Sequence, residues 1–445
     1  MENNTPLSPE CTAVDLSVAD LSVADLSAEL REELTDHILP FWLAHSRDSA
    51  SGGFYGTLGN DNVGDPTDTR SVVMVGRHLW TYSAAARFLR DTALLEGADY
   101  AYAYLVSNFL DAEYGGVYWS VDRDGKPADS NKQVYGEAFA IYGLSEYAAA
   151  LHDLRPGSPA ADTALSAALG IYQHLEAHAL DHQYGGYVEA CARDWGTSSE
   201  TKLSDADIEY NKSMNTNLHV LEAFTCLHRA VVLLRPDDRE LQQRVKKSLE
   251  DLIIITVEKI LGADAHLDLY FTADWKSLRD IISFGHDIEA SWLIWEAAEE
   301  TANRKILDRV RPVVLRIAEA AFNEGFDVAG NPVADRPMGA MENEQHGDGK
   351  RDRIRIWWCQ AEAMVGFFNA WELSGDKKYL EGVAKQWEWI KTYQRDRAGG
   401  DWFWAVTPEG EPIRFLPKGG NWKTPYHNGR SCMELLRRKN KELKK

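Results

Sequence analysis

The sequence predicts an all-α fold, an (α/α)6 barrel of twelve helices with short β-hairpins in the loops on the face that carries the candidate functional residues. Three observations support this class. Apolar residues recur at i, i+3, i+4 and i+7 over long segments from Leu26 onward, which is the period of an amphipathic helix. A glycine-rich aromatic break interrupts these segments at a regular interval. Each interval has room for two helices of about twenty residues.

The break is a pair of glycines followed by aromatic residues. It occurs at 52–55, 115–118, 185–187 and 399–402, with weaker echoes at Gly262 and Gly325. These six positions divide the chain into units of roughly seventy residues, which constitutes an internal repeat. The aromatic stretches that follow the glycines, such as 117–121 before Asp124 and Gly125, alternate in polarity and predict small hairpins.

The helices predicted from the periodicity come two to a unit: 27–48, 70–90, 91–110, 133–153, 159–180, 212–234, 237–261, 286–302, 304–324, 353–374, 376–395 and 427–440. Six helical hairpins in a row either close into a ring, with one inner and one outer helix from each, or stack as an open solenoid. Closure is favoured because neither terminal unit has the polar face of a solenoid cap.

One domain is expected over residues 26–445, since no linker or change of composition divides the helical region. Residues 1–25 are interpreted as a variable N-terminal extension, because an exact tandem repeat, DLSVADLSVADL at 15–26, precedes the first unit. We expect this extension to be dispensable, as chain termini of this kind tolerate truncation.

The charge balance excludes several classes of partner. Lys and Arg number 48 and Asp and Glu 69, so the net charge is −21. A chain this acidic is repelled by phosphate backbones and anionic lipid, which argues against nucleic acid and membrane partners. The most apolar run, 252–257, is too short to span a bilayer. A small-molecule partner and a monomeric protein are the expectation.

The cysteines and the N-terminal residues indicate the cellular compartment in which the protein is expected. Five scattered cysteines without a CxxC pair favour neither a disulfide scaffold nor a zinc site, and indicate a reducing environment. The first twelve residues have no basic region and no apolar core, unlike a signal peptide. We therefore expect a cytoplasmic protein.

Aromatic residues are unusually common, with 15 Trp and 18 Tyr. Such rings either fill gaps between helices or serve as stacking platforms for sugars. The distribution of the rings bears on the choice, because several accompany unusual polar residues near the start of the second helix of each unit. The aromatic and polar candidates, one set for each of the six units in order, are Arg77; Tyr135; Asn215 and His219; His286, Glu289 and Trp292; Trp358 and Glu362; and Trp422 and His427. In a closed barrel all six sets would converge on one pocket.

Each candidate has a functional and a purely structural interpretation. His286 and Glu289 are three apart and share a helix face, so the carboxylate either orients the imidazole and raises its basicity or forms a surface ion pair. Asn215 and His219 share a face as well, and a satisfied core histidine is the alternative there. Arg77 lies among apolar residues, where a charge is costly without an anionic partner.

Two further observations concern ligands. Glu362 follows Trp358 by four residues, which suits a sugar, with the ring stacking on the C–H face and the carboxylate accepting hydroxyl hydrogen bonds. No metal is predicted, because the HxxE at 286–289 lacks a third ligand at suitable spacing and HExxH is absent. GxSxG, P-loop and dinucleotide motifs are absent too, so no cofactor is predicted.

Five segments together resemble the cellobiose 2-epimerases of the N-acylglucosamine 2-epimerase superfamily. They are Lys132–Phe139, Met214–Glu222, GHDIEASW at 285–292, WWCQAEA at 357–363 and WKTPYHN at 422–428, and the resemblance extends over about residues 30–435. It implies an (α/α)6 barrel that converts the reducing-end glucose of β-1,4-linked disaccharides to mannose without a cofactor.

The resemblance also implies roles for single residues. His286 and His427 resemble the two acid/base histidines, Glu289 the carboxylate that supports His286, and Arg77 the arginine at the reacting oxygens. The remaining candidates resemble hydroxyl contacts (Tyr135, Asn215, His219 and Glu362) and aromatic walls (Trp292, Trp358 and Trp422). Asn217 and Cys359 depart from the family pattern, which has His and Pro at these places. Both are expected beside the pocket, where they would affect substrate preference.

The chemistry of C2 inversion fits this set. A carbonyl at C1 of the opened ring acidifies the C2 proton, and inversion needs a base on one face of C2 and an acid on the other. Arg77 could stabilise the enediolate between them. Three alternatives stay open: an aldose–ketose isomerase of mannose-type sugars, an inverting glycosidase that uses Glu289 and Glu362, and a carbohydrate-binding protein without activity.

Overall fold

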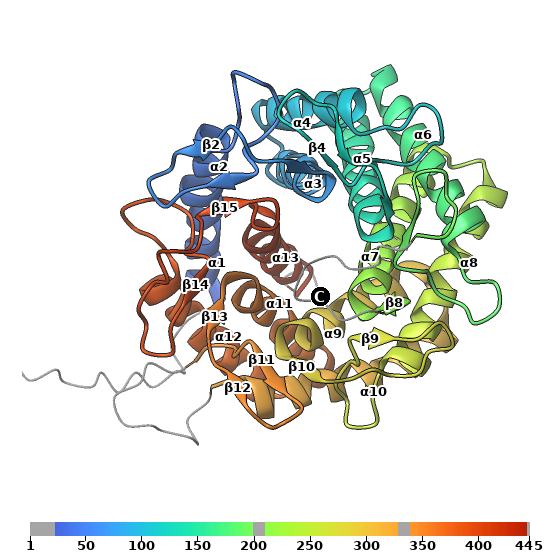
Figure 1. The fold of residues 1–445 in the computed structure, drawn as a ribbon. Helices are drawn as coiled ribbons and strands as arrows, with labels where there is room; N and C mark the ends of the chain where they lie inside the picture. Colours follow the sequence, from blue (N-terminus) through green and yellow to red (C-terminus); the bar gives the residue numbers. More distant parts are fainter. Residues whose placement is uncertain (1–22, 199–209, 328–338, 443–445) are drawn as a thin grey trace, which may run out of the picture.

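The computed structural model describes residues 23–198, 210–327 and 339–442. In this part of the chain two concentric rings of helices surround a common axis (Figure 1). The inner ring comprises α3 (Val72–Leu89), α5 (Val134–Leu154), α7 (Met214–Leu234), α9 (Phe284–Thr301), α11 (Trp357–Ser374) and α13 (Tyr426–Glu442). The outer ring comprises α1 (Val23–Glu32) with α2 (Leu39–His45), α4 (Leu95–Asn108), α6 (Pro159–His174), α8 (Arg239–Ile255), α10 (Arg304–Ala320) and α12 (Lys377–Trp389).

Consecutive inner helices pack against one another, and α13 packs against α3. The ring is therefore closed, which confirms the predicted (α/α)6 barrel and excludes the open solenoid. The inner helices are buried over most of their length, whereas the outer helices bury one face only. This difference follows from their positions, since an inner helix has neighbours on both sides as well as behind it.

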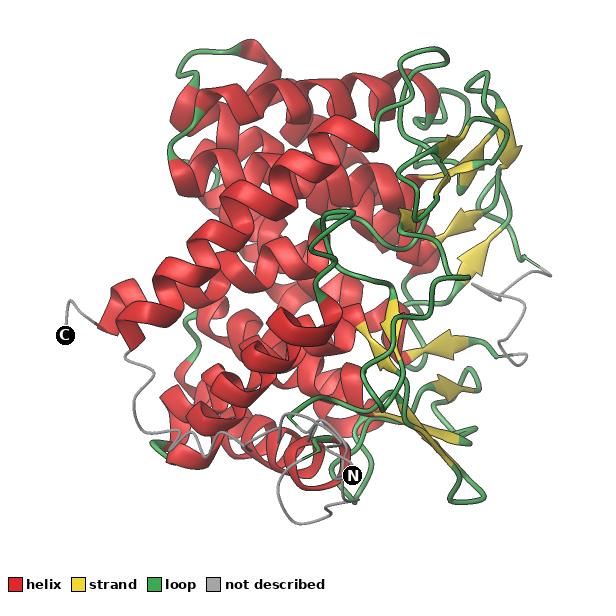
Figure 2. Cartoon of the chain, turned by 90° about the vertical axis from the view of Figure 1, so that its left-hand side faces the viewer, coloured by secondary structure: helices red, strands yellow, loops and turns green. Residues whose placement is uncertain are grey.

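Six short antiparallel sheets occupy one end of the barrel in the described residues (Figure 2). Each pairs the strand just before an inner helix with a strand from the loop of the next unit. The strands are β15 (Gly419–Gly420) with β1 (Thr57–Leu58) and β2 (Gly64–Asp65); β3 (Arg70–Ser71) with β4 (Ser120–Val121) and β5 (Pro127–Asp129); β6 (Lys132–Gln133) with β7 (Ala190–Cys191); β8 (Lys212–Ser213) with β9 (Tyr270–Phe271); β10 (Ile281–Ser283) with β11 (Glu344–His346) and β12 (Arg351–Asp352); and β13 (Arg355–Ile356) with β14 (Ala405–Val406). Hairpins occur as predicted in β1–β2, β4–β5 and β11–β12, but the sheets also join neighbouring units. The β15–β1 pair, in which Thr57 faces Gly420, joins the last unit to the first.

The outer helices differ from uninterrupted α-helices, because five of them in the described residues contain a π-helical turn. The turns are Glu33–Ile38 between α1 and α2, Leu175–Ala179 after α6, Thr256–Ile260 after α8, Ala321–Gly325 after α10 and Ile390–Gln394 after α12. A further short 3₁₀ turn, Thr92–Leu94, precedes α4. The π turn satisfies a carbonyl at the helix end: the N–H of Leu180, for example, donates to the carbonyl of Leu175 at 2.9 Å.

The glycine pairs of the sequence form tight loops between outer and inner helices. Gly115 and Gly116 have φ of 74° and 68°, a left-handed conformation that glycine adopts at little cost. The loop is closed by a bridge between Leu110 and Val117, and equivalent bridges occur in the other five units. A Cβ on Gly116 would lie 2.7 Å from a carboxylate oxygen of Glu137 on α5. This close approach lets Glu137 accept a hydrogen bond from the N–H of Val117 at 3.0 Å.

Ion pairs hold five of the six loops in place in the described residues. A buried or nearly buried aspartate after the outer helix pairs with a basic residue in or next to the strand that precedes the inner helix. The pairs are Asp48–Arg70, Asp111–Lys132, Asp181–Lys212, Asp327–Arg355 and Asp396–Lys418. In the fourth unit Gly262 replaces the aspartate, and Asp264 pairs with Arg279 instead. These pairs fix the angle at which each chain segment enters its inner helix.

Helix α7 is long and apolar enough to cross a bilayer by length and composition. It is an inner helix, however, and 78% of its most apolar window is buried inside the protein. Its hydrophobicity is therefore explained by its place in the barrel.

Helix α1 begins at Val23, so the predicted boundary at residue 25 falls inside it; residues 1–22 lie outside the described residues. Leu26 and Leu30 of α1 are 7% and 2% exposed and belong to the core. We expect a chain that starts at Val23 to keep the melting temperature of the full chain. Deletion through Leu30 should cost several kcal/mol of unfolding free energy, since each lost core leucine contributes about 2–5 kcal/mol. Equal melting temperatures for both truncations would show that α1 adds nothing to the fold.

Candidate active site

A cavity of about 300 Å³ opens at the end of the barrel that carries the sheets. It is lined by Arg77, Tyr135, Asn215, His219, His286, Glu289, Ile356, Trp357, Trp358, Trp404, Trp422 and His427. Nine of the predicted site residues are among them, drawn from all six inner helices or the segments just before them. Convergence follows from the closed ring, because every inner helix begins at the same end. Trp404 and Trp357 were not among the sequence candidates.

Arg77 is a buried cation in the wall of this cavity, 4% exposed. Its Nη1 donates to the carbonyl of Trp422 at 2.6 Å and its Nη2 to the hydroxyl of Tyr135 at 2.9 Å. Its guanidinium carbon also lies 4.5 Å from the centre of the Phe139 ring. Among the described residues no carboxylate lies within ion-pair distance of Arg77. The positive charge is thus held in place by neutral groups and remains available to an anion in the cavity.

His286 is held differently from what the sequence indicated. Its Nδ1 lies 2.8 Å from the Ser283 hydroxyl, whereas Glu289 makes no hydrogen bond to it. Residues three apart do share a helix face, but the Glu289 carboxylate is drawn instead to Arg430, whose Nη2 lies 2.7 Å from its Oε1. The predicted support of His286 by Glu289 is therefore wrong for this structure, and Ser283, just before α9, takes that place.

His427 has the carboxylate partner that His286 lacks. Its Nδ1 lies 2.6 Å from Oε1 of Glu362 on α11. Glu362 also accepts a hydrogen bond from the indole N–H of Trp292 at 3.0 Å. Neither Glu362 nor Trp292 lines the cavity, and both are buried beneath its floor. This placement does not match the sugar contacts predicted for Glu362 and Trp292. Instead, Glu362 holds Nδ1 of His427, and Trp292 in turn holds Glu362. The Nε2 atom of His427 is left for the cavity.

The sequence reasoning missed a charged network under the cavity floor. Arg430 on α13 donates to Glu289, Glu362 and Glu222, and it also contacts the hydroxyl of Tyr426. Glu222 in turn lies 2.8 Å from Nδ1 of His219. A signal was present, since His219 and Glu222 are three apart on one helix face, as are His427 and Arg430. One guanidinium thus connects the supports of two histidines in the cavity.

Burial shifts the pKa values of the ionisable groups in this site. Burial and the nearby His219 lower the pKa of His286 to about 3. Burial, together with Arg77 and Arg430, lowers the pKa of His427 well below its usual range. These shifts favour the neutral form of both imidazoles at neutral pH, in which each is able to accept a proton.

The carboxylates of the network separate into two kinds. Burial and the neighbouring Glu362 raise the pKa of Glu289 to about 8, against the opposing effect of Arg430. Burial alone would raise the pKa of Glu222, but Arg430 and His219 lower it to about 2. Burial lowers the pKa of His219 despite the nearby Glu222. These shifts favour the anion for Glu222 and the neutral acid for Glu289.

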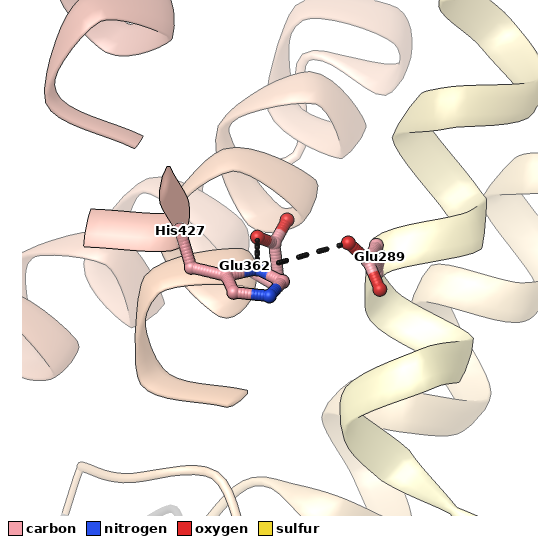
Figure 3. Close-up of side chains that lie close together, drawn as sticks. All are labelled: Glu289, Glu362 and His427. Carbon is pink, nitrogen blue, oxygen red and sulfur yellow. Dashed lines mark hydrogen bonds and ion pairs between the residues drawn. The ribbon is translucent and has the colours of Figure 1, made fainter. Parts of the chain in front are cut away.

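Glu289, Glu362 and His427 converge from α9, α11 and α13 (Figure 3). One potential ligand atom from each lies within 4.8 Å of the others, a spacing that a metal ion could use. Nη2 of Arg430, however, contacts Oε1 of both glutamates, at 2.7 and 2.6 Å. A divalent cation would have to displace or approach this guanidinium, so the residues present do not favour a metal.

We expect catalysis to survive removal of metal ions, because a guanidinium already occupies the position between the carboxylates. The measurement is the rate of the C2 inversion that the sequence resemblance implies, after dialysis against EDTA and in an untreated sample. An activity that disappears with chelator and returns with Mg²⁺, Mn²⁺ or Zn²⁺ would overturn this expectation.

Asn217 and Cys359, the two residues that depart from the family pattern, lie outside the cavity wall. The Asn217 side chain accepts from the N–H of Tyr187 at 2.8 Å and donates to its carbonyl at 3.1 Å, so it fastens a loop as Glu137 does. Cys359 is fully buried against α9, and a Cβ on Gly285 would lie 2.5 Å from its sulfur. Neither residue lines the cavity, which leaves no direct contact through which they would select a substrate.

Comparison with known proteins agrees with this architecture. A family model described as N-acylglucosamine 2-epimerase matches residues 53–429. A cellobiose 2-epimerase from Bacteroides fragilis is 38% identical over 411 residues, 92% of this chain and 98% of that protein. The solved structure of cellobiose 2-epimerase from Spirochaeta thermophila is 40% identical, with a TM-score of 0.82 over 95% of this chain and 98% of that one. A D-mannose isomerase from Thermobifida fusca is 25% identical over 78% of this chain and 80% of that protein.

The barrel, the cavity at its sheet end and these matches define an enzyme of the epimerase and isomerase class. The chain belongs to the N-acylglucosamine 2-epimerase family.

Proposed function

We propose that the protein inverts C2 of the reducing-end glucose of cellobiose-like β-1,4-linked disaccharides, yielding mannose at that end. The observation that carries the proposal is that His286 and His427, on separate inner helices, reach one cavity together with the unpaired cation Arg77. The relatives named cellobiose 2-epimerase support the choice of substrate class. We further propose that the enzyme acts as a cytoplasmic monomer without a cofactor.

The reaction starts from the open-chain sugar, whose C1 carbonyl acidifies the proton on C2. One imidazole removes this proton, and the other supplies a proton to the opposite face. The Trp358 ring adjoins both imidazoles, with its centre 4.6 Å from that of His286 and 5.8 Å from that of His427. The enediolate formed meanwhile is an anion, and its negative charge raises the pKa of nearby imidazoles as it develops. Glu362, hydrogen-bonded to Nδ1 of His427, stabilises that ring when it becomes positively charged.

Arg77 supplies the electrostatic stabilisation that the enediolate needs. Its fixed charge costs no reorganisation during the reaction, because Trp422 and Tyr135 already hold the guanidinium. Asn215 contributes a buried side-chain oxygen without a hydrogen-bond partner among the described residues, and the residue lines the cavity. We assign this oxygen to a sugar hydroxyl, and the rings of Trp358, Trp404 and Trp422 to the C–H faces of the sugar.

The isomerase alternative shares the enediolate and differs in returning the proton to C1. The glycosidase alternative is weaker, because an inverting pair stands about 6.5–9.5 Å apart with a water between its carboxyl groups. Here carboxyl oxygens of Glu289 and Glu362 lie within 4.8 Å of each other, and Glu362 does not line the cavity. A binding protein without activity has no need for two imidazoles beside an unpaired guanidinium.

Incubation with cellobiose in deuterated water, followed by NMR, separates these possibilities. Glucosyl-mannose labelled with deuterium at C2 is the expected product. A ketose would indicate the isomerase, free glucose the glycosidase, and unchanged cellobiose a binding protein or a different substrate. Any of these three outcomes would refute the proposal, and parallel incubations with lactose and mannobiose would rank the disaccharides.

A further inference from the structure

Two carboxyl groups under the cavity floor share one nitrogen atom of Arg430. Its Nη2 lies 2.7 Å from Oε1 of Glu289 and 2.6 Å from Oε1 of Glu362. Both glutamates are at most 1% exposed. Two buried anions this close repel each other strongly, and one guanidinium shared with Glu222 as well does not neutralise all three. One proton shared within the network lowers this excess of negative charge by one unit.

The hydrogen bonds of the two carboxyl groups differ in a way that locates the proton. Glu362 accepts from three donors, namely Trp292, His427 and Arg430, which is the environment of a carboxylate. Among the described residues Glu289 is hydrogen-bonded to Arg430 alone, and it lines the cavity. Protonation of Glu289 therefore sacrifices fewer hydrogen bonds and leaves an O–H group that can reach the cavity.

We propose that Glu289 works as a neutral carboxylic acid that donates a hydrogen bond to a hydroxyl of the bound sugar, while Glu362 stays an anion behind His427 and Arg430 positions both. Glu289 is then a substrate-contacting residue, not a base and not the partner of His286. The inference deepens the proposed function, on which its kinetic test rests. Its chemistry requires only a polyhydroxylated ligand that offers an acceptor oxygen next to Glu289.

Burial raises the pKa of both Glu289 and Glu362, so the charges agree with one shared proton, and the hydrogen bonds assign that proton to Glu289. The ionisable groups that face it come from four inner helices: Arg430, His427 and Tyr426 on α13, Glu362 and Cys359 on α11, Glu222 on α7, and Tyr135 on α5. Burial and Glu362 raise the pKa of Glu289 to about 8. The neutral form is thus fully present below that value and is lost as the pH rises through it. The activity should consequently decline on the alkaline side of about pH 8.

Matched glutamine substitutions test the proposal, because glutamine imitates a neutral carboxylic acid and cannot ionise. Glu289→Gln should lower kcat/KM by less than about tenfold, the scale of exchanging one uncharged hydrogen-bond donor for another. It should also abolish the alkaline decline. Glu362→Gln removes the anion behind His427 and should cost about 100-fold or more. Equal losses for both variants, or an alkaline decline that persists in Glu289→Gln, would refute the assignment.

Infrared difference spectroscopy of the free enzyme provides a test that needs no activity. The spectrum of wild type minus Glu289→Gln below pH 8 should contain the C=O band of a protonated carboxyl group, and this band should disappear above that pH. Glu289→Asp, which keeps a carboxyl group, serves if the glutamine variant does not fold. A carboxylate band in place of the acid band would overturn the proposal even if wild-type epimerisation is confirmed. The acid band in an enzyme inactive on cellobiose would overturn only the proposed substrate.

Discussion

His286→Asn and His427→Asn should each lower the rate of C2 epimerisation by about three orders of magnitude or more, given what positioned acid–base groups contribute. Asparagine keeps part of the polarity and volume of histidine and cannot exchange a proton near neutral pH. His427 is 5% exposed and His286 faces the cavity, so neither ring is a large part of the hydrophobic core. The measurement is the initial rate of glucosyl-mannose formation, with thermal unfolding as the control for fold.

His219→Asn is the matched control for these two variants. His219 lines the same cavity and is buried, with its Nδ1 held by Glu222. Because we assign it a sugar hydroxyl and no proton transfer, its substitution should raise KM more than it lowers kcat. A loss of kcat equal to that of the other two histidines would mean that the acid–base pair has been wrongly assigned.

Arg77→Met should lower kcat/KM by about 10²–10³-fold, the range observed when a preorganised donor to a developing oxyanion is removed. Arg77→Lys retains the charge, but a single ammonium group does not reproduce the two-sided hold on Trp422 and Tyr135. We therefore expect the lysine variant to fall between wild type and Arg77→Met. A methionine variant with nearly wild-type kcat/KM would show that the enediolate charge is stabilised elsewhere.

The fold could be predicted from the sequence because each of its signals is local. Glycine pairs such as Gly115–Gly116 mark the loops, and the apolar period of helices marks both rings. The sheets between units escaped prediction because most of their strands are two residues long, too short for an alternating pattern. The ion pairs were missed for another reason: Asp111 and Lys132 lie 21 residues apart on either side of a loop, and nothing local connects them.

The site was predictable where residues share a helix and less so where they meet across the barrel. The helix starts identified Arg77, His286 and His427, and all three line the cavity. The spacing of His286 and Glu289 indicated a shared face, but it could not reveal that Arg430, 141 residues further on, binds that carboxylate. Glu362 was predicted to accept hydrogen bonds from sugar hydroxyls. In the structure it contacts His427 instead, which lies 65 residues later in the sequence. Partnerships of this kind depend on closure of the ring and require the three-dimensional structure.

Deuterium wash-in from each epimer, measured on His286→Asn and His427→Asn, tests the central claim that the two histidines serve opposite faces of C2. The variant that keeps the base for the glucose form should exchange the C2 proton of cellobiose with solvent without inverting it. The other variant should exchange the C2 proton only when it starts from glucosyl-mannose. If both variants retain full epimerisation in both directions, or if both exchange from the same epimer only, the two-histidine mechanism is contradicted.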